Sequence, residues 1–140
     1  MNKNLKFKLY DKKKNEIVNY VDCSISIADG GVQSFNKDGI MQGTLNNRHL
    51  IPIQYAGKKD IKGIEIYQGF IVERFDIKGH VITGAVAFKN CSWWIENKVQ
   101  NIKVPLFTLS EVDSVIGNIY QDKELAREIG YEFKGEIENG

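Results

Sequence analysis

The chain has 140 residues, 42% of them hydrophobic and 26% charged, and its formal net charge at pH 7 is +1. This balance is typical of a globular domain and excludes a disordered chain, while the near-neutral charge gives no general attraction to nucleic acid. No apolar run reaches the ~20 residues of a membrane-spanning helix, and the N-terminus lacks the apolar core of a signal peptide, so we expect a cytoplasmic protein without membrane contact.

Alternating hydrophobicity predicts a half-buried strand at Leu5–Tyr10 and a return strand at Glu16–Val21, joined by a polar turn. The run Lys12–Lys14 in that turn is interpreted as a solvated hairpin tip, and the alternative is a patch that contacts phosphates. The apolar segment His49–Tyr55 contains Pro52, which cannot donate a sheet hydrogen bond. This strand is therefore expected at an edge, at a bulge or in a crossing segment.

Residues 22–48 carry the weakest pattern of the chain. Two adjacent glycines after Asp29 indicate a turn. Short strands are predicted around it at Ser24–Ala28, Val32–Phe35 and Ile40–Leu45. We expect a single domain, 1–140, in which residues 22–48 form a variable excursion, either a small hairpin layer or a mobile segment, and residues 131–140 form a tail.

Three apolar-rich segments form the centre of the sequence: Ile64–Phe75, Val81–Phe88 and Cys91–Glu96. They are rich in Ile, Val, Phe, Tyr and Trp, and short turns join them, so they predict a meander of antiparallel strands. The predicted fold class is mainly β, or α+β at most. By pattern analogy, its core resembles a small SH3-like barrel.

The residue pattern of the C-terminal part predicts a last strand and a helix, and this is the only helix that the sequence supports. The strand is Val115–Tyr120, with Gly117 at a bulge or at a point of close packing. The helix is Lys123–Ile129, with Asp122 as its N-cap and Gly130 as a left-handed residue after its end.

Two long segments and one short one resemble a known family. Asp60–Val72 reads DIKGIEIYQGFIV and looks like the signature D-x-x-G-x-E-I-Y-x-G-D-I-V of the YopX family of small phage and prophage proteins. Val115–Leu125 reads VIGNIYQDKEL and is similar to the family's ending V-I-G-N-I-Y-E-N-P-E-L. The opening KFKLYD, Lys6–Asp11, resembles its F-R-x-W-D start less closely.

The sequence departs from that family at three positions: Phe70 replaces the usual Asp, Lys123 replaces a proline, and Tyr10 replaces a Trp. Phe70 removes any functional role that the Asp had, whereas a structural role in a turn would be easier to replace. The resemblance implies an origin in a phage or prophage, a location in the host bacterial cytoplasm, homo-oligomer formation and no recognised enzymatic activity.

The residues themselves define no catalytic, metal or cofactor site. His49 and His80 are not placed to converge with a nucleophile, and the carboxylates are scattered along the chain. Cys23 and Cys91 lack the spacing of metal ligands and are interpreted as reduced, partly buried thiols. We therefore expect a protein that is not an enzyme and needs no metal or cofactor.

An aromatic and basic group supplies the candidate binding residues. Trp93 and Trp94 are neighbours on one predicted strand, so their side chains point to opposite faces. Tyr67, Arg74 and Lys89 lie on or next to neighbouring strands. An exposed Trp beside these cations can stack a base and hold a phosphate, or it can anchor an interface between protomers.

The sequence thus supports a first hypothesis of a non-catalytic phage accessory protein that acts as a homo-oligomeric binding module. One alternative is a nucleic-acid-binding module that uses the aromatic and basic face. Another is a counter-defence protein that sequesters a signalling nucleotide or blocks a host protein. The sequence does not decide which of these partners is bound.

Overall fold

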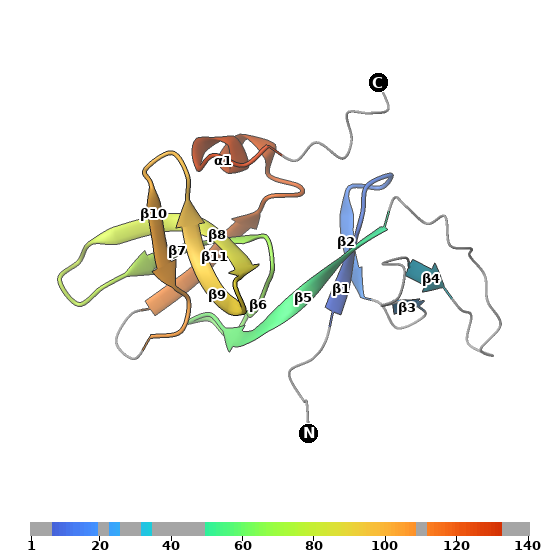
Figure 1. The fold of residues 1–140 in the computed structure, drawn as a ribbon, viewed down its shortest axis with the longest axis horizontal. Coiled ribbons are helices and arrows are strands. Elements are labelled where there is room, and N and C mark those ends of the chain that lie inside the picture. The colour runs from blue at the N-terminus through green and yellow to red at the C-terminus, as the bar shows by residue number, and fades with distance from the viewer. Residues whose placement is uncertain (1–6, 20–22, 26–31, 35–49, 109–111, 133–140) are drawn as a thin grey trace. The chain divides into compact units, whose positions relative to one another are not determined.

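The computed structural model describes residues 7–19, 23–25, 32–34, 50–108 and 112–132 (Figure 1). The chain divides into two compact units, one of Lys6–Gln54 and the other of Met1–Leu5 with Tyr55–Gly140. The expectation of one domain stays a prediction. Within the described ranges no helix has the length and apolar character to cross a membrane.

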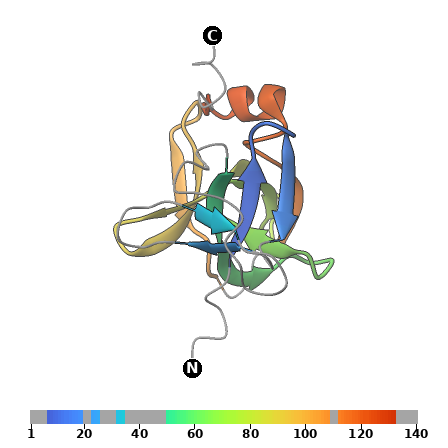
Figure 2. The same cartoon turned by 90° about the vertical axis from the view of Figure 1, so that its right-hand side faces the viewer.

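The unit Lys6–Gln54 is built on an antiparallel hairpin of β1 (Phe7–Asp11) and β2 (Glu16–Asn19), seen in blue in Figure 2. The first half of β5 (Leu50–Lys59) pairs with β1 on its other side, and Pro52 lies opposite Leu9. In this half β5 has β1 as its one described neighbour, so Pro52 lies on an edge strand, as predicted.

Two short strands, β3 (Cys23–Ile25) and β4 (Val32–Ser34), pair with each other in this unit. They confirm parts of the two strands predicted there. The third predicted strand, Ile40–Leu45, lies outside the described residues, as does most of the 131–140 tail.

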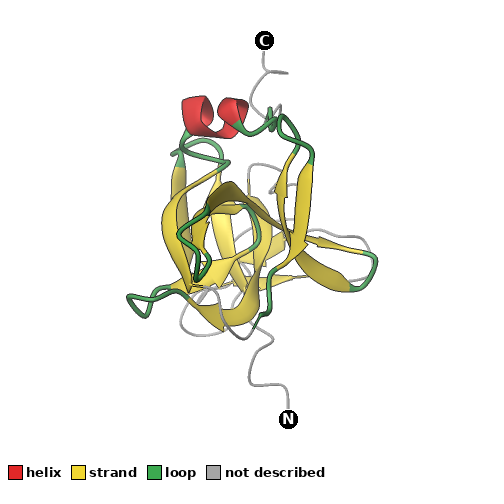
Figure 3. Ribbon diagram, turned by 90° about the vertical axis from the view of Figure 1, so that its left-hand side faces the viewer, coloured by secondary structure: helices red, strands yellow, loops and turns green. Residues whose placement is uncertain are grey.

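The unit that contains Tyr55–Gly140 is built on a curved antiparallel sheet in the order β10-β9-β8-β7-β11 (Figure 3). Its strands are β7 (Phe70–Phe75), β8 (Val81–Lys89), β9 (Ser92–Asn97), β10 (Ile102–Pro105) and β11 (Val112–Asn118). The second half of β5 pairs with β6 (Glu65–Tyr67). The mainly β, antiparallel fold class is confirmed, whereas the SH3-like barrel stays a prediction.

The apolar segment Ile64–Phe75 forms two strands. It breaks at Gln68–Gly69 into β6 and β7, which pair with different strands. The break occurs because Gly69 has a φ of +87°, which lies outside the extended region of a strand. Its N–H donates to the Val86 carbonyl at 2.8 Å, so the turn is attached directly to β8.

The sheet separates two apolar layers. One face carries Val72, Val86 and Ile95, all of which are almost completely buried. On the opposite face, Ile71 and Ala85 pack against the helix α1 (Lys123–Glu128) through Ala126 and Ile129. We call this second side the helix face of the sheet.

The C-terminal predictions are confirmed in outline. β11 changes register between Val115 and Gly117, and a Cβ at Gly117 would come within 2.6 Å of the Asp122 carboxylate, so Gly117 serves both as bulge and as close contact. Gly130 follows α1 with a φ of +92°. Asp122 stands at the N-cap position, but its carboxylate accepts the Asn118 N–H at 2.9 Å instead of capping the helix.

The buried carboxylate of Asp60 fastens the turn before β6 to β11. It accepts the N–H groups of Lys62 and Ile64, both at 2.8 Å, and that of Val115 at 2.9 Å. Burial raises the pKa of Asp60, but these backbone hydrogen bonds outweigh it and hold the pKa below its usual value. Because β5 continues to Lys59, this turn begins at Asp60 itself.

Asp60→Asn is expected to lower the free energy of unfolding at pH 7 by about 1–3 kcal/mol, because an amide has one acceptor oxygen for three donors. A group with a depressed folded pKa stabilises the protein above its unfolded pKa, and this stabilisation is lost as the pH falls through the folded pKa. The difference between wild type and variant should therefore shrink below pH 4, the region of the unfolded pKa. Urea unfolding at several pH values measures it.

Asp76→Asn is the matched control, because the described partners of the Asp76 carboxylate all belong to its own turn: it accepts the N–H groups of Lys78 and His80 and lies 3.1 Å from His80 Nδ1. It should change stability less than Asp60→Asn does. Equal effects of the two variants would show that the bond from the turn to Val115 adds nothing.

Candidate binding site

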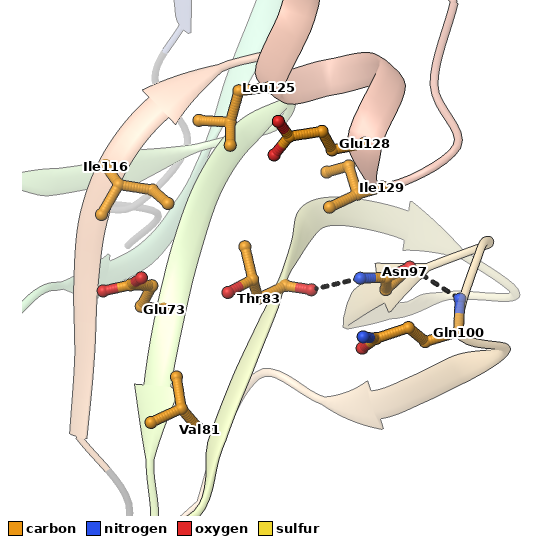
Figure 4. A pocket seen from close by; sticks show the side chains of 9 residues that line it. All are labelled: Glu73, Val81, Thr83, Asn97, Gln100, Ile116, Leu125, Glu128 and Ile129. Carbon is orange, nitrogen blue, oxygen red and sulfur yellow. Dashed lines mark hydrogen bonds between the residues drawn. The ribbon is translucent and has the colours of Figure 1, made fainter.

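A cleft of about 300 Å³ opens on the helix face where α1 ends (Figure 4). The helix covers only part of this face, so the sheet beyond it forms the floor. The apolar lining residues are Val81, Ile116, Leu125 and Ile129. The polar lining residues are Glu73, Thr83, Asn97, Gln100 and Glu128.

The wall of the cleft nearest the β9–β10 turn is held by Asn97. Its side-chain N–H donates to the Thr83 carbonyl at 2.9 Å, and its side-chain oxygen accepts the Gln100 N–H, also at 2.9 Å (Figure 4). Asn97 is 4% exposed, so these bonds are shielded from water. The turn that carries Gln100 is therefore fixed against β8.

The ionisable side chains that line the cleft are both acidic. Glu73 is on β7, and Glu128 is on α1 across the opening (Figure 4). Neither carboxylate forms an ion pair with a Lys or Arg of the described residues. The cleft therefore combines negative charge with aliphatic walls.

Three apolar side chains continue the same face beyond the cleft. Val112, Phe75 and Val81 lie opposite one another on β11, β7 and β8, and they are 39%, 41% and 51% exposed. Directly opposed residues have their Cβ atoms about 4.5–5.5 Å apart, so the three form one continuous strip, which we call the apolar row. Val81 belongs to both the row and the cleft.

Arg74, a predicted binding residue, is buried on the other side of the sheet. It is 2% exposed, and its Nε and Nη2 donate to the two carboxylate oxygens of Asp113 at 2.7 and 2.9 Å. It also donates to the carbonyls of Pro105 and Leu106, and Lys58 Nζ reaches Asp113 at 2.9 Å. Arg74 is thus placed to join β7 to β11 and β10, not to meet a ligand at the surface.

The acid of this buried cluster is held in its charged form. Burial raises the pKa of Asp113, but hydrogen bonds and charge from Arg74 and Lys58 outweigh it and leave the pKa below its usual value. Lys58 also donates to the Leu106 carbonyl at 2.9 Å. The cluster therefore links four segments of this unit through charged hydrogen bonds.

Tyr67 is also buried, at the strand β6. Its ring lies against those of Tyr55 and Phe70, with centroids 5.4 and 5.6 Å away, and its hydroxyl donates to Glu65 at 3.0 Å. Burial and the neighbouring carboxylate raise its pKa. The residue is part of the packing between β5, β6 and β7.

The two tryptophans lie on opposite faces of β9, as alternation requires, and both are half-buried. Trp93 packs on Phe88, with 4.9 Å between ring centroids. Trp94 donates its indole N–H to the Lys89 carbonyl at 3.0 Å, and Lys103 Nζ lies 4.7 Å from its ring centroid.

Lys89 pairs with Glu96, at 2.8 and 3.0 Å from its two oxygens, and Tyr131 donates to the same carboxylate at 2.6 Å. Of the five predicted residues, the structure therefore brings Trp94 and Lys89 together, whereas Arg74 and Tyr67 are buried elsewhere.

Sequence reasoning missed the residues of the cleft. Glu73 and Glu128 are distant in sequence and form no motif. Strand alternation was the one available signal, because it places Glu73 and Phe75 on one face of β7, and Val81 and Thr83 on the facing side of β8. In the described parts of the chain no three His, Cys, Asp or Glu side chains gather as metal ligands would.

The fold and the cleft define a small antiparallel β-protein with a short C-terminal helix laid across one face of its sheet. The chain belongs to the YopX family: the family model described as YopX protein matches residues 6–126. The structure is similar to the crystal structure of protein yopX from Bacillus subtilis, with a TM-score of 0.61, 17% sequence identity and coverage of 89% of this chain and 98% of that one. No curated protein matches the sequence.

Proposed function

We propose that the protein is a non-catalytic, homo-oligomeric binding module whose protomers meet through the apolar row. The observation that carries this proposal is the alignment of Val112, Phe75 and Val81 across three strands, with each side chain more than a third exposed. Contiguous apolar patches of this kind mark interaction surfaces, because removing them from water is favourable by about 25 cal/mol per Å².

A second copy of the chain is the partner that this surface fits best. In a two-fold contact the same patch meets itself, so its own charges would face like charges. The row carries no charge and avoids this repulsion. Phe75 is its aromatic member and thus the natural anchor of such a contact.

Phe75→Glu is expected to dissociate the oligomer, because the variant sets carboxylates against each other at the centre of the contact. Size-exclusion chromatography with light scattering should give a multiple of the 15.9 kDa protomer mass for the wild type and the monomer mass for the variant. The dissociation constant should rise by a factor of roughly thirty or more, the effect of an interface anchor.

Val99→Glu is the matched control, because Val99 is 64% exposed in the β9–β10 turn and is not part of the row. It should keep the mass of the wild type. A wild type that is monomeric at micromolar concentration contradicts the proposal, and so does a folded Phe75→Glu variant of unchanged mass.

The alternatives raised by the sequence stay predictions. Two cations of the nucleic-acid alternative form ion pairs within the protein, Arg74 with Asp113 and Lys89 with Glu96. This weakens the support for that alternative. Mobility-shift assays at low salt test it. The counter-defence alternative, with a signalling nucleotide or a host protein as partner, is tested by thermal-shift screening and by co-purification.

A further inference from the structure

The cleft beside α1 has a lining whose chemistry selects one class of ligand. We propose that it binds an ammonium group carried on an aliphatic stem, with Glu73 and Glu128 facing the charge. The proposal goes beyond oligomer formation and does not depend on it, because it rests on the two carboxylates of the cleft, and the cleft shares only Val81 with the apolar row.

The ionisable side chains of the cleft favour a cationic ligand. Glu73 and Glu128, the two acidic side chains of the lining, approach the opening from the sheet and from the helix. No Lys or Arg lines the cleft, and none of the described cations pairs with either carboxylate. A cationic ligand would supply the positive charge that no described Lys or Arg places beside these two carboxylates.

The aliphatic side chains of the lining favour an organic cation over a metal ion. Ile116 and Leu125 supply no ligand atoms to a metal, whereas they can cover the methylene groups of an alkyl chain. Ordinary ligand pockets begin near 300 Å³, so a volume of about 300 Å³ suits a short chain such as a lysine side chain or a diamine.

The segments that line the cleft are held in place by hydrogen bonds and packing. Asn97 fixes the turn of Gln100 to β8, and the packing of Ala126 and Ile129 on the sheet fixes the helix that carries Glu128. A preformed site spares the ligand the cost of ordering the protein. The cleft is therefore preformed, and a ligand could bind without rearrangement of the segments that line it.

The test is an amide NMR titration of the full chain with 1,5-diaminopentane and, separately, with lysine capped at both backbone ends. We expect saturable shifts centred on Thr83, Gln100 and Glu128, and no such shifts with 1-pentanol or with sodium chloride at equal ionic strength. Saturation with the capped lysine identifies a partner's side chain as the source of the ammonium group, and saturation with the diamine alone identifies a free amine.

Glu73→Gln should weaken binding at least about tenfold, and Glu73→Gln with Glu128→Gln should abolish it. Glu124→Gln is the matched control, because Glu124 lies in the first turn of the same helix and does not line the cleft. Absence of saturable shifts with both amines overturns the proposal, as does equal affinity in the double variant. A monomeric wild type overturns only the proposed oligomer, since the titration reads the cleft in either state.

Discussion

Asp113→Ala is expected to lower the free energy of unfolding by about 3–5 kcal/mol, the loss that follows when one member of a buried ion pair is removed. The variant leaves the guanidinium of Arg74, which is 2% exposed, without the carboxylate that accepts two of its N–H groups. Lys58 loses its ion-pair partner in the same variant. Urea unfolding followed by tryptophan fluorescence measures the change.

The double variant Arg74→Met with Asp113→Leu separates the ion pair from the burial of an unpaired charge. Replacing both partners by apolar side chains removes the uncompensated charge, so the double variant should be more stable than Asp113→Ala. A loss in Asp113→Ala below 1 kcal/mol, the range of an exposed ion pair, would mean that water reaches Arg74 and that the cluster is not structural.

Acid should weaken the same cluster. The folded pKa of Asp113 is depressed, so its contribution to stability is present above the unfolded pKa, near 4, and is lost as the pH falls through the folded pKa. The stability of the wild type should therefore decline below pH 4 more steeply than that of the Arg74→Met, Asp113→Leu variant.

The sequence predicted those elements whose cause is local. The β1–β2 hairpin, the bulge at Gly117 and the end of α1 at Gly130 all follow from period, turn residues and glycine conformation. The partners of β6 and β7 were not predicted: β6 pairs with β5 and β7 pairs with β8 and β11, and no local pattern encodes the choice of partner.

The candidate site was harder to predict for the same reason. Arg74 looks like a surface cation in the sequence, but its partner Asp113 is 39 residues away on β11. Glu73 and Glu128 meet the cleft from a strand and a helix that only tertiary packing brings together. Alternation indicates which face a side chain takes, but not what covers that face.

The residues that carried the family resemblance have structural roles in this protein. Asp60 fastens a turn, Glu65 accepts the hydroxyl of Tyr67, and Gly69 occupies a left-handed position. Phe70, which departs from the family pattern, is 9% exposed and packs on Tyr67. The shared motif therefore specifies the fold of this region, and a packing role suffices to explain Phe70.

The two segments of that resemblance also contact each other, at Gly69 and Tyr120. The Gly69 carbonyl accepts the Ile119 N–H at 2.8 Å, and the Tyr120 hydroxyl donates to the Gln68 carbonyl at 3.3 Å. A Cβ at Gly69 would lie 2.5 Å from two atoms of the Tyr120 side chain. This contact joins the start of β7 to the connection between β11 and α1.

Gly69→Ala is therefore expected to destabilise the protein by about 3 kcal/mol or more, through backbone strain at positive φ together with overpacking. Gly63→Ala is the matched control, because Gly63 has nearly the same φ, +86°, but a Cβ added there would meet no atom within 4 Å. It should cost only the backbone strain, about 1–2 kcal/mol. Denaturant unfolding of the two variants isolates the cost of the clash.

Removing the Tyr120 ring should then change the effect of Gly69→Ala. Tyr120→Leu opens space for the new methyl group, so the double variant should lose less stability than the sum of its two single variants. Tyr120→Phe removes the hydroxyl but keeps the ring atoms that the methyl group meets, so it should give less relief. If Gly69→Ala costs no more than Gly63→Ala, the ring moves aside freely and the contact does not constrain the fold. If Gly69→Ala costs more stability than Gly63→Ala, and Tyr120→Leu restores part of the loss, the contact constrains the fold. It then limits how closely the start of β7 can approach the connection between β11 and α1.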